Sequence, residues 1–248
     1  MLGEDLALSA SSSFTKMLTR PWSIITHMFA HVQFGHFLFN MIALYSMGQM
    51  FVSIQGSRKL LTLYVLGGLS GFIAFALAYN SSNVLNGGGT HYVLGASAAV
   101  MAIVVTTATL QPKRVILLFG VFKIELMWLA GILVLLDLAS IRDGVNSGGH
   151  IGHIGGAIFG YFYGTQLKKG KDMGAWFQKI IDTLKGVFSR RKMSVASNNG
   201  RPKTDEQFNI EKKERQKRID IILDKISRSG YESLSKDEKD FLFKHSQK

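Results

Sequence analysis

The chain has 248 residues, of which 47% are hydrophobic and 19% charged, and its formal net charge is +12. The charges are unevenly distributed, because the stretches 21–57, 60–112 and 144–167 contain no Asp, Glu, Lys or Arg. The absence of cysteine excludes disulfides, a cysteine nucleophile and thiolate metal sites. Long apolar stretches without charge indicate a polytopic membrane domain, which we place at 1–170, and the charged remainder, 171–248, indicates a basic tail.

Five membrane spans are expected in chain order, at 35–54, 60–79, 92–110, 126–141 and 150–167. The segment 115–122 is either part of the fourth element or an interfacial segment. One end of the spans carries the basic residues, which are Arg58, Lys59, Lys113, Arg114, Lys123, Lys168, Lys169 and Lys171. Because cytoplasmic loops carry an excess of Lys and Arg, this end and the C-terminus are predicted to be cytoplasmic.

The N-terminal segment conflicts with this topology. Five spans with a cytoplasmic C-terminus would place Met1 outside, although residues 1–19 lack the apolar core of a signal peptide and contain Lys16. We therefore expect that one N-terminal span precedes this sequence, for example because of a misplaced start codon. The alternative is that the chain begins at Met1.

The tail is predicted to contain three helices. The first, from 173 to 188, has apolar residues at helical spacing with basic residues nearby, which is typical of an amphipathic helix on the anionic inner leaflet. A linker at 193–204 separates it from a charged helix at 205–228, which ends before Gly230. Ser235 and Glu238 form a capping-box pattern that starts a short last helix. Nucleic-acid binding is not expected, because acidic residues are interleaved and no recognition motif is present.

Polar residues within membrane spans are candidates for function. The membrane domain holds His27, His31, His36, Asn40, Ser97, His150 and His153. His36 and Asn40 are four residues apart and therefore share one helix face. In the predicted topology, Ser97, His36 and His153 lie near the non-cytoplasmic ends of their spans. These three residues and Asn40 can therefore converge at one depth below the outer surface.

Ser97 lies within the stretch 92–101, which follows a glycine-rich loop at 87–89. Close helix packing through small residues is one explanation for a serine here. A serine near a helix start has a second use, because the first backbone N–H groups lack partners in the helix and can donate to a developing oxyanion. Gly156, Gly160 and Gly164 form a smooth face that would allow the helix bearing His153 to dock on the helix bearing Ser97. A nucleophile beside a base is the arrangement of covalent hydrolysis.

At these residues the chain resembles the rhomboid intramembrane serine proteases of the bacterial type. Three matching motifs occur in the family's order within about 21–167, namely His31-x4-His36-x3-Asn40, Gly95-Ala96-Ser97 and His153-x2-Gly156-x3-Gly160. The resemblance implies an all-α fold, a polytopic membrane helix bundle of the rhomboid type with six core spans, of which the first is absent here. It also implies a multi-pass protein of the bacterial inner membrane that acts on membrane-protein substrates.

The family's site residues can be carried over by position. The resemblance implies that Ser97 is the nucleophile and His153 the general base of a dyad without an aspartate. It implies that His36, Asn40 and the Ser97 backbone N–H form the oxyanion site, with His31 in a structural role and Gly95, Gly156 and Gly160 in support. No cofactor and no metal are expected.

Two residues depart from the family pattern. Ala98 stands where the family usually has glycine, and its methyl group could crowd the oxyanion site. Met101 stands where the family usually has an aromatic residue that packs on the catalytic histidine, although a thioether can also contact an imidazole ring. Asp137 is expected to be a buried hydrogen-bonding or near-interface residue and not a third catalytic member, and His150 a residue at the entry to its span.

Three functions are therefore considered. The leading hypothesis is an intramembrane serine endopeptidase that cleaves transmembrane segments through Ser97 and His153. The alternative is a rhomboid-like pseudoenzyme that binds membrane-protein clients without cleavage, which Ala98 and the missing span suggest. The third is a metal site or transporter built on the histidines, although His150-Ile-Gly-His153 lacks the glutamate of a zinc-protease helix.

Overall fold

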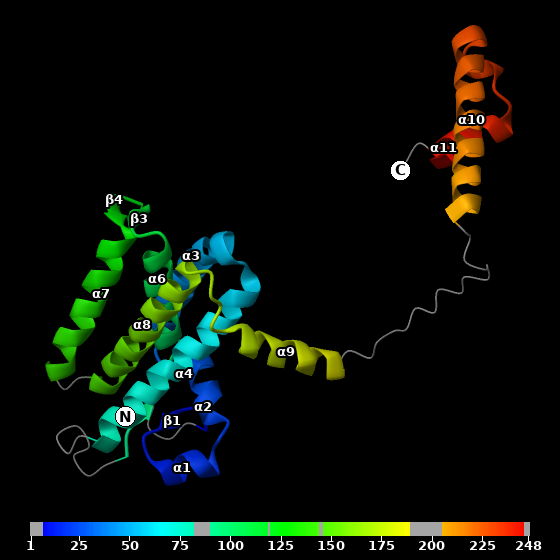
Figure 1. Cartoon of the computed structure of the whole chain (residues 1–248). Coiled ribbons are helices and arrows are strands. Elements are labelled where there is room, and N and C mark those ends of the chain that lie inside the picture. Colours follow the sequence, from blue (N-terminus) through cyan, green and yellow to red (C-terminus); the bar gives the residue numbers. More distant parts are fainter. Residues whose placement is uncertain (1–6, 82–89, 119, 144–145, 189–204, 246–248) are drawn as a thin grey trace. The chain divides into compact units, whose positions relative to one another are not determined.

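The computed structural model describes residues 7–81, 90–118, 120–143, 146–188 and 205–245 (Figure 1). The described chain forms two compact units, Met1–Arg190 and Arg191–Lys248, which are treated separately below. The glycine-rich loop at 87–89 and the linker predicted at 193–204 lie outside the described residues.

Five helices form the bundle of the first unit. They are α3 (Phe34–Gln55), α4 (Ser57–Ser81), α6 (Ser97–Leu110), α7 (Leu126–Ser140) and α8 (Ser147–Lys168). By length and composition α3 and α4 can each cross a membrane, and α6 and α7 are shorter apolar helices. The five predicted spans are thus present as helices, but the third begins at Ser97 and not at residue 92, because Tyr92–Val93 forms a strand, β2.

The centre of the bundle is α6, which contacts α3, α4, α7 and α8 (Figure 1). Every residue from Ala99 to Ala108 is buried. This burial agrees with the sequence of α6, which contains no charged residue and is apolar on all sides, as expected of a helix with neighbours all round.

The helices α4, α6 and α8 pack through glycines whose missing side chains leave room for a neighbouring backbone. A Cβ atom at Gly156 of α8 would lie 2.2 Å from the carbonyl oxygen of Ala98, and one at Gly160 would lie 2.4 Å from that of Ala102. On α4, a Cβ atom at Gly67 would lie 2.4 Å from the Cβ of Ala102. The predicted glycine face of α8 therefore does bring this helix against the one that starts at Ser97.

The outer helices expose large apolar side chains. On α7 these include Trp128, Ile132 and Leu135, and on α3 they include Phe39 and Tyr45. In a membrane helix bundle, such exposed apolar side chains on the outer helices face the lipid.

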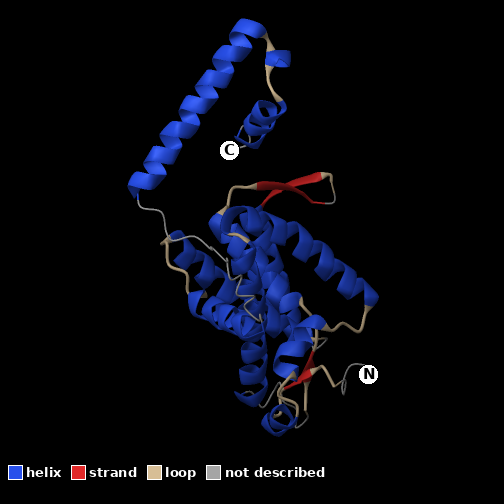
Figure 2. Cartoon of the chain, turned by 90° about the vertical axis from the view of Figure 1, so that its right-hand side faces the viewer, coloured by secondary structure: helices blue, strands red, loops and turns tan. Residues whose placement is uncertain are grey.

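Short elements join the ends of the bundle helices. The N-terminal segment forms β1 (Ala10–Ser11), which pairs antiparallel with β2, followed by α1 (Phe14–Thr19), α2 (Ser23–Thr26) and the 3-10 helix η1 (His27–Phe29). At the other end, β3 (Val115–Leu118) and β4 (Phe122–Glu125) form an antiparallel hairpin (Figure 2). The segment 115–122 is therefore mainly one arm of a hairpin. A second 3-10 helix, η2 (Ile141–Asp143), follows α7.

The helix α9 (Ala175–Phe188) belongs to the first unit, whereas the sequence analysis assigned it to the tail. Two groups of polar contacts join it and its leading turn to the bundle. Arg58 pairs with Asp182 at 2.6 Å, and the Tyr163 hydroxyl donates to Asp172, which also accepts from Gln178. The Arg58–Asp182 pair joins residues distant in sequence, and the first unit extends past α9, so the change in composition near 171 does not mark the structural boundary.

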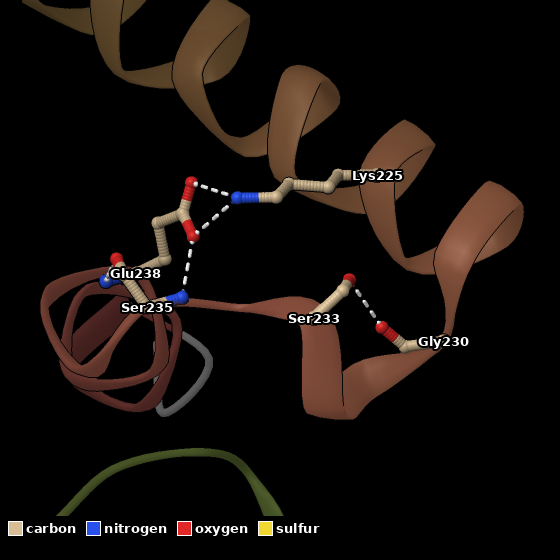
Figure 3. Close-up of polar contacts among 5 residues, drawn as sticks. All are labelled: Lys225, Gly230, Ser233, Ser235 and Glu238. Carbon is tan, nitrogen blue, oxygen red and sulfur yellow. Dashed lines mark hydrogen bonds and ion pairs between the residues drawn. The ribbon is translucent and has the colours of Figure 1, made fainter.

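The second unit is a helical hairpin whose bounds match the prediction. It consists of α10 (Asp205–Ser229), the 3-10 helix η3 (Tyr231–Ser233) and α11 (Lys236–His245). Gly230 follows α10 with a φ of +75°, a conformation that favours glycine. The capping box is confirmed, because Ser235 N–H donates to Glu238 at 2.7 Å and Glu238 N–H donates to the Ser235 hydroxyl at 3.3 Å. Figure 3 shows that the two carboxylate oxygens of Glu238 each also accept a hydrogen bond from the Lys225 ammonium group of α10.

Candidate active site

Ser97 is the first residue of α6, and the turn before it is fixed by two hydrogen bonds. The Gly95 N–H donates to the carbonyl oxygen of His27 at 2.9 Å, and the Ala96 N–H donates to His31 Nε2 at 3.3 Å. Gly95 has a φ of +128°, which only glycine adopts without strain. The first helical hydrogen bond of α6 runs from the Val100 N–H to the Ala96 carbonyl oxygen. The N–H groups before Val100 at the start of α6, including that of Ser97, therefore have no partner within the helix.

His36 faces the Ser97 hydroxyl across Gly95. A Cβ atom at Gly95 would lie 3.4 Å from His36 Nε2 and 3.8 Å from Ser97 Oγ, so the absent side chain leaves a space between the two polar groups. A ring N–H on this side and the backbone N–H groups at the start of α6 together form a set of donors near one point. That arrangement can stabilise an oxyanion.

Asn40 is buried behind His36. Its amide nitrogen donates to the His36 carbonyl oxygen at 3.0 Å and lies 3.4 Å from His31 Nε2. Asn40 thus links the two histidines at the start of α3, and its participation in the oxyanion site stays a prediction.

A small cavity of about 50 Å³ joins the predicted residues. Ser97, His36 and His153 all line it, together with Asn146 and Gly152. A volume of this size holds a water molecule. Neither Asn40 nor His150 is among the described residues that line it.

His153 is held by a buried carboxylate on α7. His153 Nδ1 lies 2.8 Å from Asp137 Oδ1, and the same oxygen lies 2.7 Å from His150 Nδ1. Within the described residues, His153 Nε2 is buried and makes no hydrogen bond, with Ser97 or any other group. Asp137 is buried and hydrogen-bonded, as the sequence analysis expected, and its contact with His153 was not predicted.

The same three residues could hold a metal ion. One ligand atom from each of Asp137, His150 and His153 lies within 4.8 Å of the others. Two histidine nitrogens and a carboxylate are a donor set that zinc accepts. The two hydrogen bonds to Asp137 also account for the contact between these side chains.

The comparisons with known proteins identify the family of the chain. Residues 18–170 match the Rhomboid domain, which covers more than half of the chain. The chain belongs to the rhomboid family. Residues 203–248, which contain the helical hairpin of the second unit, match a family of unknown function.

Similar rhomboid proteins come from mitochondria. The chain is 30% identical to RHOMBOID-like protein 12 of Arabidopsis thaliana, over 60% of the chain and 47% of that protein. It is 31% identical to Rhomboid protein 1 of Saccharomyces cerevisiae, over 61% and 43%, and 28% identical to the human presenilin-associated rhomboid-like protein, over 62% and 40%. The chain thus spans less than half the length of these relatives. Because they are named as mitochondrial, the predicted bacterial type and bacterial inner membrane have no support from them.

Ala98, which departs from the usual rhomboid pattern, has a specific neighbour. A Cβ atom at Gly71 of α4 would lie 2.5 Å from the Ala98 methyl carbon. The extra methyl group therefore occupies space that Gly71 leaves open, although Ala98 also lines the cavity. Met101 is buried in the core of the bundle.

Sequence reasoning missed Asn146, a polar residue of the cavity. Asn146 precedes α8 with a φ of +56° and lines the cavity beside Ser97. A signal was present, since asparagine tolerates this left-handed conformation and is followed by Ser-Gly-Gly at the start of the helix.

Proposed function

We propose that this rhomboid protein is an intramembrane serine endopeptidase in which Ser97 is the nucleophile and His153 the general base. The observation that carries the proposal is the cavity lined by both residues, together with the buried Nε2 of His153, which makes no hydrogen bond among the described residues and can accept a proton. Ser97 Oγ and this nitrogen are not hydrogen-bonded to each other, and hydrogen bonds between catalytic groups often form only when a substrate is bound.

The reaction is an acyl transfer in two steps. Ser97 Oγ attacks the scissile carbonyl carbon of a substrate segment while His153 Nε2 takes the hydroxyl proton, and the oxyanion accepts hydrogen bonds from the Ser97 N–H and His36. The amine leaves with the proton from His153, which gives an acyl-enzyme on Ser97. A water molecule then loses a proton to His153 and attacks the ester carbonyl carbon, and the carboxylic acid is released as His153 returns this proton to Ser97 Oγ.

The substrates in this proposal are transmembrane segments of membrane proteins. Transmembrane segments of membrane proteins can reach a site among helices whose outer faces are apolar, and the site lies at the bundle end opposite the basic residues Arg58, Lys113 and Lys168. With the positive end on the cytoplasmic side, cleavage occurs near the outer end of the substrate helix. The exposed Trp176, Ile180 and Leu184 of α9, with basic residues nearby, suit contact with the anionic leaflet on the positive side.

Cleavage of a single-span reporter in liposomes tests the proposal. Wild type should release the cleaved product, while Ser97→Ala and His153→Ala should reduce the rate by at least about 10³-fold, because nucleophile and base act as a unit. His150→Ala is the matched control, since His150 is near His153 but does not line the cavity, and it should retain cleavage. Retained cleavage in Ser97→Ala or His153→Ala would refute the dyad.

A pseudoenzyme that binds membrane-protein clients is the second candidate, and the methyl group of Ala98 at the cavity favours it. In that case neither wild type nor Ser97→Ala cleaves the reporter, and both bind it equally. Recovery of cleavage in Ala98→Gly alone would show that the methyl group blocks the site.

The metal alternative makes a separate prediction. If Asp137, His150 and His153 serve only as a hydrogen-bonded group, EDTA and 1,10-phenanthroline leave the cleavage rate unchanged. Inhibition by both chelators, reversed by zinc, would support a metal at this cluster instead.

A further inference from the structure

We propose that Asp137 is a positioning residue that holds the His153 ring with Nε2 directed to the Ser97 cavity, so that three residues and not two carry the activity. The proposal rests on the proposed function. It differs from the dyad that the sequence resemblance implies and from the expectation that Asp137 has no part in the site.

The first argument concerns the proton on the imidazole ring. A carboxylate only accepts hydrogen bonds, so His153 must carry a proton on Nδ1 to bond Asp137 Oδ1 at 2.8 Å. In the neutral ring this leaves Nε2 with the lone pair. Nε2 is the nitrogen that is buried without a hydrogen bond among the described residues, and His153 lines the Ser97 cavity. The contact therefore selects the tautomer that a general base needs.

The second argument concerns orientation. Asp137 is buried on α7, and its side chain is only 9% exposed, so water does not readily replace its contact with the ring. His153 stands on α8, which packs tightly against α6 through Gly156. With its backbone fixed by α8 and its Nδ1 fixed by α7, the ring loses freedom to turn away from Ser97. A fixed carboxylate also favours the imidazolium that forms when His153 takes the serine proton.

The third argument concerns the carboxylate itself. His150 Nδ1 bonds the same oxygen at 2.7 Å, and the two histidine rings stand nearly perpendicular, with an interplanar angle of 84°. His150 does not line the cavity, so its contact cannot act on a substrate directly. A carboxylate oxygen has lone pairs for both N–H groups, so the His153 contact with Asp137 Oδ1 does not require the His150 contact.

Asp137→Asn is the direct test, because it keeps the size of the side chain and removes the charge. An amide oxygen carries no full charge, so it accepts the two Nδ1–H bonds more weakly than a carboxylate oxygen does. With the amide turned over, its NH₂ group faces Nδ1 and disfavours a proton there. On the liposome reporter we expect kcat to fall by about 10²-fold with KM unchanged, because the lost contact acts on the reacting base and not on substrate binding. His150→Gln is the matched control, which removes the other donor, and its kcat should stay within about fivefold of wild type.

A nitrogen NMR spectrum of the histidine rings supplies a readout that is independent of turnover. In the full-length wild type, the His153 signal, assigned by its absence in His153→Gln, should show a protonated Nδ1 and an unprotonated Nε2. In Asp137→Asn the Nε2-protonated form should gain population. In His150→Gln the His153 signal should match wild type.

Failure of this inference and failure of the proposed function are separable. Wild-type cleavage that depends on Ser97, with Asp137→Asn equally active, would overturn the positioning role and leave the protease standing. A wild type that cleaves nothing would contradict the proposed function, and the NMR tautomer would still decide whether Asp137 fixes His153. A protonated Nε2 in wild type, or an equal loss of kcat in His150→Gln and Asp137→Asn, would overturn the inference.

Discussion

The helices of the two units of this rhomboid protein pack by different interactions. In the membrane bundle, α4, α6 and α8 meet at glycines, and backbone carbonyl oxygens or alanine methyl groups of the neighbouring helix lie where a Cβ atom would be. In the helical hairpin of the tail, α10 and α11 meet through Lys225 and Glu238, and the capping box on Ser235 starts the second helix (Figure 3). In lipid there is no hydrophobic driving force for helix association, so membrane helices are stabilised by close packing of their backbones. The tail hairpin is stabilised instead by an ion pair between its helices and by a capping box. Substitutions should therefore have different effects in the two units.

The largest effect is expected at Gly156. In Gly156→Ala the new methyl carbon meets the Ala98 carbonyl oxygen, a backbone atom that cannot move without shifting the start of α6. We expect a loss of at least about 3 kcal/mol in the free energy of unfolding in mild detergent. The control is Gly131→Ala on α7, where a Cβ atom meets nothing within 4 Å and should be neutral or slightly stabilising. Equal losses at both positions would contradict the packing account.

A smaller loss of stability, which a second substitution should partly restore, is expected at Gly67. A Cβ atom there meets only the Ala102 methyl carbon closely, and its next contacts are ordinary at 3.7 and 3.9 Å. Gly67→Ala should cost about 2 kcal/mol, and adding Ala102→Gly should restore at least about 1 kcal/mol of the unfolding free energy. If the losses of Gly67→Ala and Ala102→Gly were additive in a double-mutant cycle, the methyl groups at positions 67 and 102 would not compete for the same space.

The smallest effect is expected in the tail hairpin. Hydrogen bonding to Lys225, and to the Ser235 backbone, holds the pKa of the Glu238 carboxyl below its usual value. Because this pKa is lowered on folding, the stabilisation is present above the usual glutamate pKa and is lost as the pH falls through the lowered one. Carbon NMR of the full-length protein should show Lys225→Met raising the Glu238 titration midpoint, while Lys217→Met on the same helix leaves it in place. An unchanged midpoint in Lys225→Met would contradict the pairing.

Local signals in the sequence predicted the tail hairpin more fully than the site. Gly230 ends one helix and Ser235 starts the next within a few residues, so each signal is read from its own neighbours. The glycine face of α8 was equally local, since Gly156 and Gly160 repeat at helical spacing. The remaining features join distant parts of the chain. Residue 92 begins a strand because it pairs with β1.

Two further long-range contacts explain what the sequence analysis missed. Arg58 draws α9 to the bundle through Asp182, although composition changes near 171. The contact of Asp137 with His153 joins two helices, and no spacing within either helix indicates it. Motif spacing thus identified Ser97, His36 and His153, which line the cavity, while Asn146 and the contact of Asp137 with His153 required the packed structure.

The most direct test of the central claim needs no knowledge of the natural substrate. A fluorophosphonate probe reacts with an activated serine, forming an oxygen–phosphorus bond with loss of fluoride, and mass spectrometry locates the adduct. For the full-length protein in liposomes, the account predicts an adduct on Ser97 in wild type and in His150→Ala, and none in His153→Ala. The account would be contradicted by a wild type that forms no adduct on Ser97, or by equally fast labelling when His153 is removed.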